Sequence, residues 1–130
     1  MQYVILYVAS AVAFFGADFV WLSTMADRVY RPALGDMMLD KPNLPVAAGF
    51  YLVYLVGLLV LVTAPANGDV GKALWMGALF GFVAYGTYDL TNLSTLRGFT
   101  PQLVAIDMAW GTVLTAVTAA AAVWIAGFFA

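Results

Sequence analysis

Three aspartates interrupt long apolar stretches of the sequence and are the residues best suited to chemistry: Asp18, Asp89 and Asp107. A carboxylate in the middle of a bilayer costs about 2.5–3.5 kcal/mol on insertion scales, so we expect these side chains to face inward. An ionised carboxylate binds a cation. Carboxyl groups that crowd together cannot all ionise, so such a cluster would also hold and exchange a proton.

Aromatic and amide side chains accompany the aspartates at helical spacing. Trp21 follows Asp18 by three residues, and Trp110 follows Asp107 by three. Asn92 follows Asp89 by three residues. The two belong to a stripe on one helix face that begins at Tyr85, four residues before Asp89. Each of the three aspartates lies four to eight residues from the end of its helix that faces one common side of the membrane, at a depth of roughly 6–12 Å. One cluster is therefore predicted as a ligand-binding site, made of Asp18, Trp21, Tyr85, Tyr88, Asp89, Asn92, Asp107 and Trp110.

A purely structural role is the alternative for these aspartates, each fixing helix packing through hydrogen bonds. Interhelical hydrogen bonds in membranes average about 0.6 kcal/mol, and Ser, Thr or Asn would supply them with less desolvation cost than three carboxyl groups. A functional site is therefore favoured. Arg97 allows two interpretations: it either extends to lipid phosphate groups or reaches into the cluster and pairs with an aspartate.

Composition excludes several protein classes. The 130 residues include five Lys+Arg and seven Asp+Glu, so only 9% are charged, whereas 65% are apolar. A soluble domain normally has about a quarter of its residues charged. The chain has neither His nor Cys, so zinc, haem, iron–sulfur and disulfide sites are not expected, and neither is a Ser–His or Cys–His nucleophile. We expect no cofactor and no metal site, and no nucleic-acid partner because no basic run is present.

The apolar stretches predict an all-α fold: a four-transmembrane-helix bundle formed by one domain, residues 1–130. The spans are expected at about 2–26, 45–63, 72–93 and 102–126, each close to the roughly 20 residues that cross a bilayer. The first is too long, and lacks the basic start, for a signal peptide. Between the first two spans, Pro32 suits the first turn of a helix, and apolar residues follow on one side of it, which predicts a short interfacial helix.

Lys and Arg residues predict the orientation. The predicted loops put four basic residues on one side of the membrane and only Lys72 on the other, namely Arg28, Arg31, Lys41 and Arg97. The positive-inside rule makes the four-charge side cytoplasmic, so both termini are expected outside the cytoplasm of a bacterial inner membrane. The Gly77-x-x-x-Gly81 spacing is typical of a close helix–helix contact, and we interpret it as packing.

Longer strings resemble a known family. They are FVAYGTYDLTNLSTLR at 82–97, DMAWGT at 107–112, DFVWL at 18–22 and YRPALG at 30–35. Together they resemble the bacterial membrane-protein family called domain of unknown function 2177, and the likeness covers nearly the whole chain. The resemblance implies a small integral membrane protein. It singles out the same Asp, Trp and Asn positions and assigns no chemistry.

Three functional classes follow from these observations. In the first, the cluster binds, and in a transporter would move, a cation or small amphiphilic, lipid-soluble ligand, since carboxylates supply charge and aromatic faces attract organic cations. In the second, an intramembrane isomerase-like enzyme uses aspartates as acid and base on a lipid or isoprenoid, and the Trp faces stabilise a carbocation. In the third, the chain is a structural subunit of a membrane complex. Membrane lipids are expected partners, and a homo-oligomer or a complex partner is left open.

Overall fold

The computed structural model describes residues 1–129, and within them the chain forms helices and turns without strands. The elements are α1 (Gln2–Met25), a π-helical turn η1 (Ala26–Tyr30), α2 (Arg31–Leu34), a 3-10 turn η2 (Gly35–Met37), α3 (Leu44–Leu58), a π-helical turn η3 (Leu59–Thr63), α4 (Val70–Thr95) and α5 (Pro101–Gly127). With η3 counted as the continuation of α3, the four long helical segments therefore begin and end within two residues of the predicted spans. The all-helical prediction is confirmed.

Three helical segments are long and apolar enough to cross a membrane: Gln2–Met37, Leu44–Thr63 and Pro101–Gly127. Helix α4 has 26 residues, which is sufficient length, but Lys72, Asp89 and several Gly, Tyr and Thr residues make it less apolar. Its crossing of the membrane stays a prediction. The long helices also expose large apolar side chains, as lipid-facing surfaces do; Val12 of α1 is 70% exposed and Val53 of α3 is 66% exposed.

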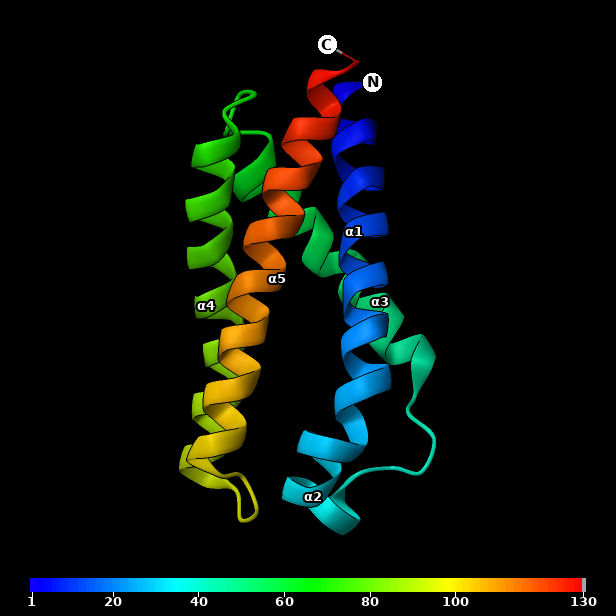
Figure 1. Cartoon of the computed structure of the whole chain (residues 1–130), viewed down its shortest axis with the longest axis vertical. Coiled ribbons are helices and arrows are strands. Elements are labelled where there is room, and N and C mark those ends of the chain that lie inside the picture. Colours follow the sequence, from blue (N-terminus) through cyan, green and yellow to red (C-terminus); the bar gives the residue numbers. More distant parts are fainter. Residues whose placement is uncertain (130) are drawn as a thin grey trace.

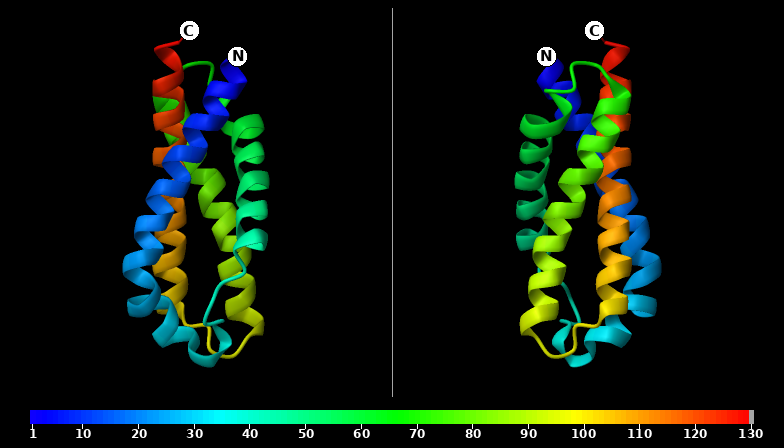
Figure 2. Two further views of the ribbon diagram at one scale, coloured as in Figure 1. Left: turned by 90° about the vertical axis from the view of Figure 1, so that its right-hand side faces the viewer. Right: turned by 90° about the vertical axis from the view of Figure 1, so that its left-hand side faces the viewer.

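Helices α4 and α5 pack against each other and diverge toward the short loop that joins them (Figures 1 and 2). Their contact depends on glycine. A Cβ atom at Gly77 would lie 2.9 Å from the Cβ of Ala119, and one at Gly81 would lie 2.5 Å from the carbonyl oxygen of Gly111. Small residues let the two backbones approach, as the sequence spacing predicted.

Helix α3 packs closely only through its second half. No residue of α3 before Tyr54 is buried, whereas Leu55 and Leu58 are fully buried, and Val62 and Thr63 of η3 are nearly so. The first half of α3 therefore stands away from the bundle core, and Figure 1 shows it and α4 on opposite sides of the view. This leaves room beside the second half of α4, the half that ends at the α4–α5 loop.

The expected interfacial helix exists as the continuation of α1. The π-helical turn η1 follows α1 directly, α2 then forms a single turn with Pro32 at its start, and η2 completes the segment. Gly35 ends α2 with φ 56°, a conformation that favours glycine. This segment and the α4–α5 loop lie at one end of the molecule, and both termini lie at the other (Figure 1).

Candidate functional site

Asp18 connects three helices. Its side chain is 5% exposed, and its two oxygens accept one hydrogen bond each, from the Tyr51 hydroxyl of α3 at 3.0 Å and from the Trp110 indole of α5 at 3.1 Å. An ionised carboxylate only accepts hydrogen bonds, so these two donors suit it. Asp18 is thus a satisfied cross-link between α1, α3 and α5.

Asp107 is held by the π-helical turn. The Tyr30 hydroxyl donates to Asp107 Oδ1 at 2.5 Å, and the Trp21 indole donates to the Tyr30 oxygen at 2.9 Å. An indole N–H is only a donor, so Trp21 occupies the acceptor side of Tyr30 and directs the Tyr30 proton toward Asp107. The extra residue of η1 places Tyr30 here, which fits the frequent occurrence of π-bulges at functional sites.

The two tryptophans join these groups. Trp21 and Trp110 stack with ring centroids 4.4 Å apart and an interplanar angle of 6°. Each indole therefore covers one face of the other, and its N–H serves an acidic group outside its own helix: Trp110 binds Asp18 directly, and Trp21 acts on Asp107 through Tyr30. The D-x-x-W spacing singled out these four residues within their own helices, but the hydrogen bonds run between helices.

Asp89 is the most deeply buried of the three aspartates, with 1% of its side chain exposed. Its Oδ2 atom is enclosed and has no hydrogen-bond partner among the residues that the structure describes. Asp107 is close enough for the two carboxyl groups to interact directly. A buried polar atom without a partner is uncommon and costs about 1–3 kcal/mol, so Asp89 calls for a functional explanation.

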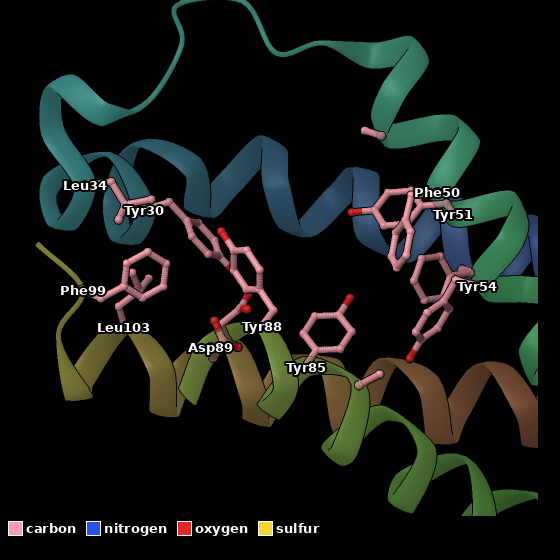
Figure 3. Close-up of a pocket in the computed structure, with 14 residues that line it drawn as sticks. Tyr30, Leu34, Phe50, Tyr51, Tyr54, Tyr85, Tyr88, Asp89, Phe99 and Leu103 are labelled. Carbon is pink, nitrogen blue, oxygen red and sulfur yellow. The ribbon is translucent and has the colours of Figure 1, made fainter. Parts of the chain in front are cut away.

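Asp89 and Asp107 line a cavity of about 410 Å³ with mainly aromatic walls. Figure 3 shows the row of side chains, with Leu34, Phe99 and Leu103 near one end, Asp89 part of the way along, and Phe50 and Tyr54 near the other. Five of the seven tyrosines of the chain contribute to the wall: Tyr30, Tyr51, Tyr54, Tyr85 and Tyr88. The volume and the mainly aromatic lining fall within the range found for small-molecule pockets in proteins.

The mouth of the cavity lies between α3 and α4. Phe50 of α3 is 59% exposed and Tyr88 of α4 is 57% exposed, although both line the cavity. Tyr88 also packs edge-to-face on Phe99, with centroids 5.9 Å apart. Because the two exposed wall residues come from two long helices, the cavity opens on the side of the bundle between α3 and α4.

The predicted site residues divide into three groups. Tyr85, Tyr88, Asp89 and Asp107 line the cavity. Asp18, Trp21 and Trp110 form the hydrogen-bonded and stacked support beside it. Asn92 is half-buried outside the wall, and Arg97 is exposed and forms no ion pair with any aspartate in residues 1–129. The structure therefore does not place Arg97 inside the cluster, and it shows no contact with lipid either.

Sequence reasoning left three tyrosines of the wall out of the site. Tyr30 was in a connection, and only the geometry of η1 turns it toward Asp107. Tyr51 and Tyr54 belong to the span at 45–63, from which no site residue was predicted. Tyr51 donates to Asp18, and the Tyr54 hydroxyl lies 2.9 Å from the Thr115 hydroxyl. Their spacing of three residues on an apolar span was a usable signal, because a buried Tyr hydroxyl needs a polar partner.

The cavity contains no basic side chain. The ion pair found within residues 1–129 joins Arg31 and Asp27, both in the end segment and at least partly exposed. No group of three or more His, Cys, Asp or Glu that would suit a metal ion occurs in that part of the chain. The two carboxyl groups of the wall can therefore accept hydrogen bonds from a bound molecule, and no basic side chain in the wall neutralises them.

Comparison with known proteins gives one match. A family model described as "Predicted membrane protein (DUF2177)" matches residues 3–124. No curated protein and no solved structure matches the chain significantly.

Proposed function

The chain belongs to the DUF2177 family of predicted membrane proteins, and we propose that it binds a small amphiphile with a cationic head group in the cavity between α3 and α4. Asp89 and Asp107 receive the head group. The aromatic wall receives the apolar body. The observation that carries this proposal is the buried Asp89 Oδ2 atom, which lines the cavity and lacks a hydrogen-bond partner among the described residues.

Charge selects the class of ligand. Two carboxyl groups and five tyrosines line the cavity, and no Lys or Arg does. Aromatic faces and carboxylates both attract organic cations, and both disfavour anions. Because Asp89 lies part of the way along the row of rings, apolar groups fit on either side of the cationic centre (Figure 3).

The sideways opening favours a ligand that reaches the site from the lipid. Phe50 and Tyr88 flank the mouth and are more than half exposed on the face where lipid chains would lie. A lipid-soluble amine partitions into the bilayer, so its local concentration there exceeds that in water. Membrane lipid is thus the medium from which the ligand enters.

The carboxyl groups lie toward the end of the molecule that carries most basic residues. Arg28 and Arg31 are in η1 and α2, and Arg97 is in the α4–α5 loop, all at the end opposite the termini (Figure 1). By the positive-inside rule this end faces the cytoplasm, with both termini outside it in a bacterial inner membrane.

Binding is testable with a cation and its uncharged isostere. Benzyltrimethylammonium and neopentylbenzene share shape and differ in charge, so the purified protein in lipid nanodiscs is titrated with each, against nanodiscs without protein. We expect the cation to bind at least about tenfold more tightly, a difference of about 1.4 kcal/mol. Equal binding of the two, or binding of neither, contradicts the proposal.

Two variants of buried aspartates form a matched pair for this titration. Asp89→Asn removes from the cavity wall a carboxyl group that can pair with the cation, and it should weaken binding of the cation about tenfold or more. Asp18→Asn removes another buried carboxyl group, one that does not line the cavity, so it should lower thermal stability and leave the affinity nearly unchanged. If both variants retain full affinity and only stability falls, the cluster is structural.

The enzyme hypothesis has less support from the arrangement. It relied on Trp faces to stabilise a carbocation, but Trp21 and Trp110 stack on each other and do not line the cavity. The hypothesis of a structural subunit is tested by the Asp89→Asn and Asp18→Asn variants described above. A homo-oligomer or a partner protein would be detected as a larger mass of the purified complex.

A further inference from the structure

The two carboxyl groups of the cavity lack any neutralising side chain. Asp89 is 1% and Asp107 is 9% exposed, and the ion pair of the described residues lies elsewhere, at Arg31 and Asp27. Two neighbouring negative charges in a low-dielectric interior repel each other strongly. The pair therefore requires either a proton or a bound cation.

The directions of the hydrogen bonds indicate which aspartate holds the proton. Asp107 accepts the Tyr30 proton, which Trp21 orients, so the ionised form of Asp107 is satisfied. Asp89 Oδ2 has no donor, and two ionised carboxylates cannot hydrogen-bond each other. A proton on Asp89 would supply the donor that a hydrogen bond between the two carboxyl groups requires. The ionisable groups around it are Asp107 on α5, Tyr30 on η1, Asp18 on α1, Tyr51 on α3, and Tyr85 and Tyr88 on α4.

We propose that Asp89 carries a proton in the ligand-free protein and releases it, one for one, when a cationic head group binds. This inference rests on the proposed function. The Asp89 O–H bond breaks, the proton passes to water, and the remaining carboxylate pairs with the cation. One positive charge replaces another, so the occupied site, with the cation included, has the same net charge as the protonated empty site, and no electron is transferred.

The exchange makes binding depend on pH in a defined direction. Proton and cation compete for one carboxylate, so lowering the pH favours the proton and weakens binding. For a single released proton the apparent affinity changes by at most about tenfold per pH unit. A cation that bound without displacing a proton would show no such dependence.

Infrared spectroscopy tests the protonated carboxyl group without any ligand. The wild-type protein in nanodiscs at neutral pH should show the carbonyl band of a protonated carboxyl group, with the expected shift in deuterium oxide. The band should be lost in Asp89→Asn and retained in Asp18→Asn. A wild-type protein without the band, or a band that persists in Asp89→Asn, overturns the assignment.

Proton release is then measured on the wild-type protein, so the test does not depend on the folding of a variant. Benzyltrimethylammonium is added to the nanodisc-embedded protein in weak buffer with a pH indicator, and bound probe is determined in parallel. We expect about one proton per bound probe. Binding without proton release overturns the exchange and leaves the proposed function intact. Absence of binding overturns both.

Discussion

Tyr30 sets the direction of the hydrogen bonds at Asp107. Its oxygen accepts from Trp21, so its only proton is left for the carboxylate. The neighbouring Asp18 shows the same principle, because a tryptophan and a tyrosine donate to its two oxygens. Two buried aspartates are thus matched with donors and the third is not, which is why Asp89 alone is assigned the exchangeable proton.

Removing the Tyr30 hydroxyl should therefore destabilise the protein. Tyr30→Phe leaves the Asp107 oxygen and the Trp21 N–H without their partner, and an unsatisfied buried group costs about 1–3 kcal/mol. We expect a lower midpoint of thermal unfolding in detergent. Tyr3→Phe is the control, since Tyr3 is 66% exposed near the other end of α1. Equal midpoints for the two variants would contradict the hydrogen-bond chain.

At the scale of the elements, the cavity depends on one close helix pair and one loose one. Glycines bring α4 and α5 together, and the Tyr85 ring lies directly over Gly111, where a Cβ atom would be 2.2 Å from the ring. The first half of α3 instead stands apart. The close pair fixes Asp89 against Asp107, and the loose helix leaves the opening.

Alanine substitutions should distinguish a glycine in the close contact between α4 and α5 from a glycine in the loosely packed half of α3. Gly81→Ala places a Cβ atom 2.5 Å from the Gly111 oxygen and 2.7 Å from Thr115, so it must push α4 and α5 apart and lower stability. Gly49→Ala in α3 meets nothing within 4 Å, and alanine favours a helix by about 1 kcal/mol. Unfolding midpoints of both variants are measured against wild type. A Gly81→Ala protein as stable as Gly49→Ala would contradict the close contact.

The elements also explain how far the sequence alone could predict the site. Helix limits follow from the lengths of apolar stretches, and helical spacing identified Asp18, Trp21, Asp107 and Trp110. Spacing describes one helix at a time, so it could not predict that each tryptophan serves an acid group beyond its own helix. Tyr30 was missed for a related reason, because its direction depends on the π-helical turn η1, which no local pattern marked.

At the scale of the whole molecule, the path of α4 decides whether the termini share one side of the membrane. Helix α4 is long enough to cross, but its composition alone does not place it among the candidate spans. Its packing along α5, a candidate span, argues that it crosses too (Figure 2). A crossing α4 puts the turn at 64–69 with the termini, and the loop at 96–100 with Arg28 and Arg31.

Reporter fusions test this arrangement. Alkaline phosphatase, active only outside the cytoplasm, and a fluorescent protein, bright only inside it, are fused in turn after Gly68, after Gly98 and at the C-terminus. The crossing of α4 predicts opposite signals at Gly68 and Gly98, because the two glycines lie in turns beyond its two ends. The positive-inside rule further predicts phosphatase activity at Gly68 and the C-terminus, and fluorescence at Gly98. Equal signals at the two glycines would mean that α4 does not cross, whereas opposite signals with the polarity reversed would leave the bundle intact and place the Asp89 end of the cavity outside the cytoplasm.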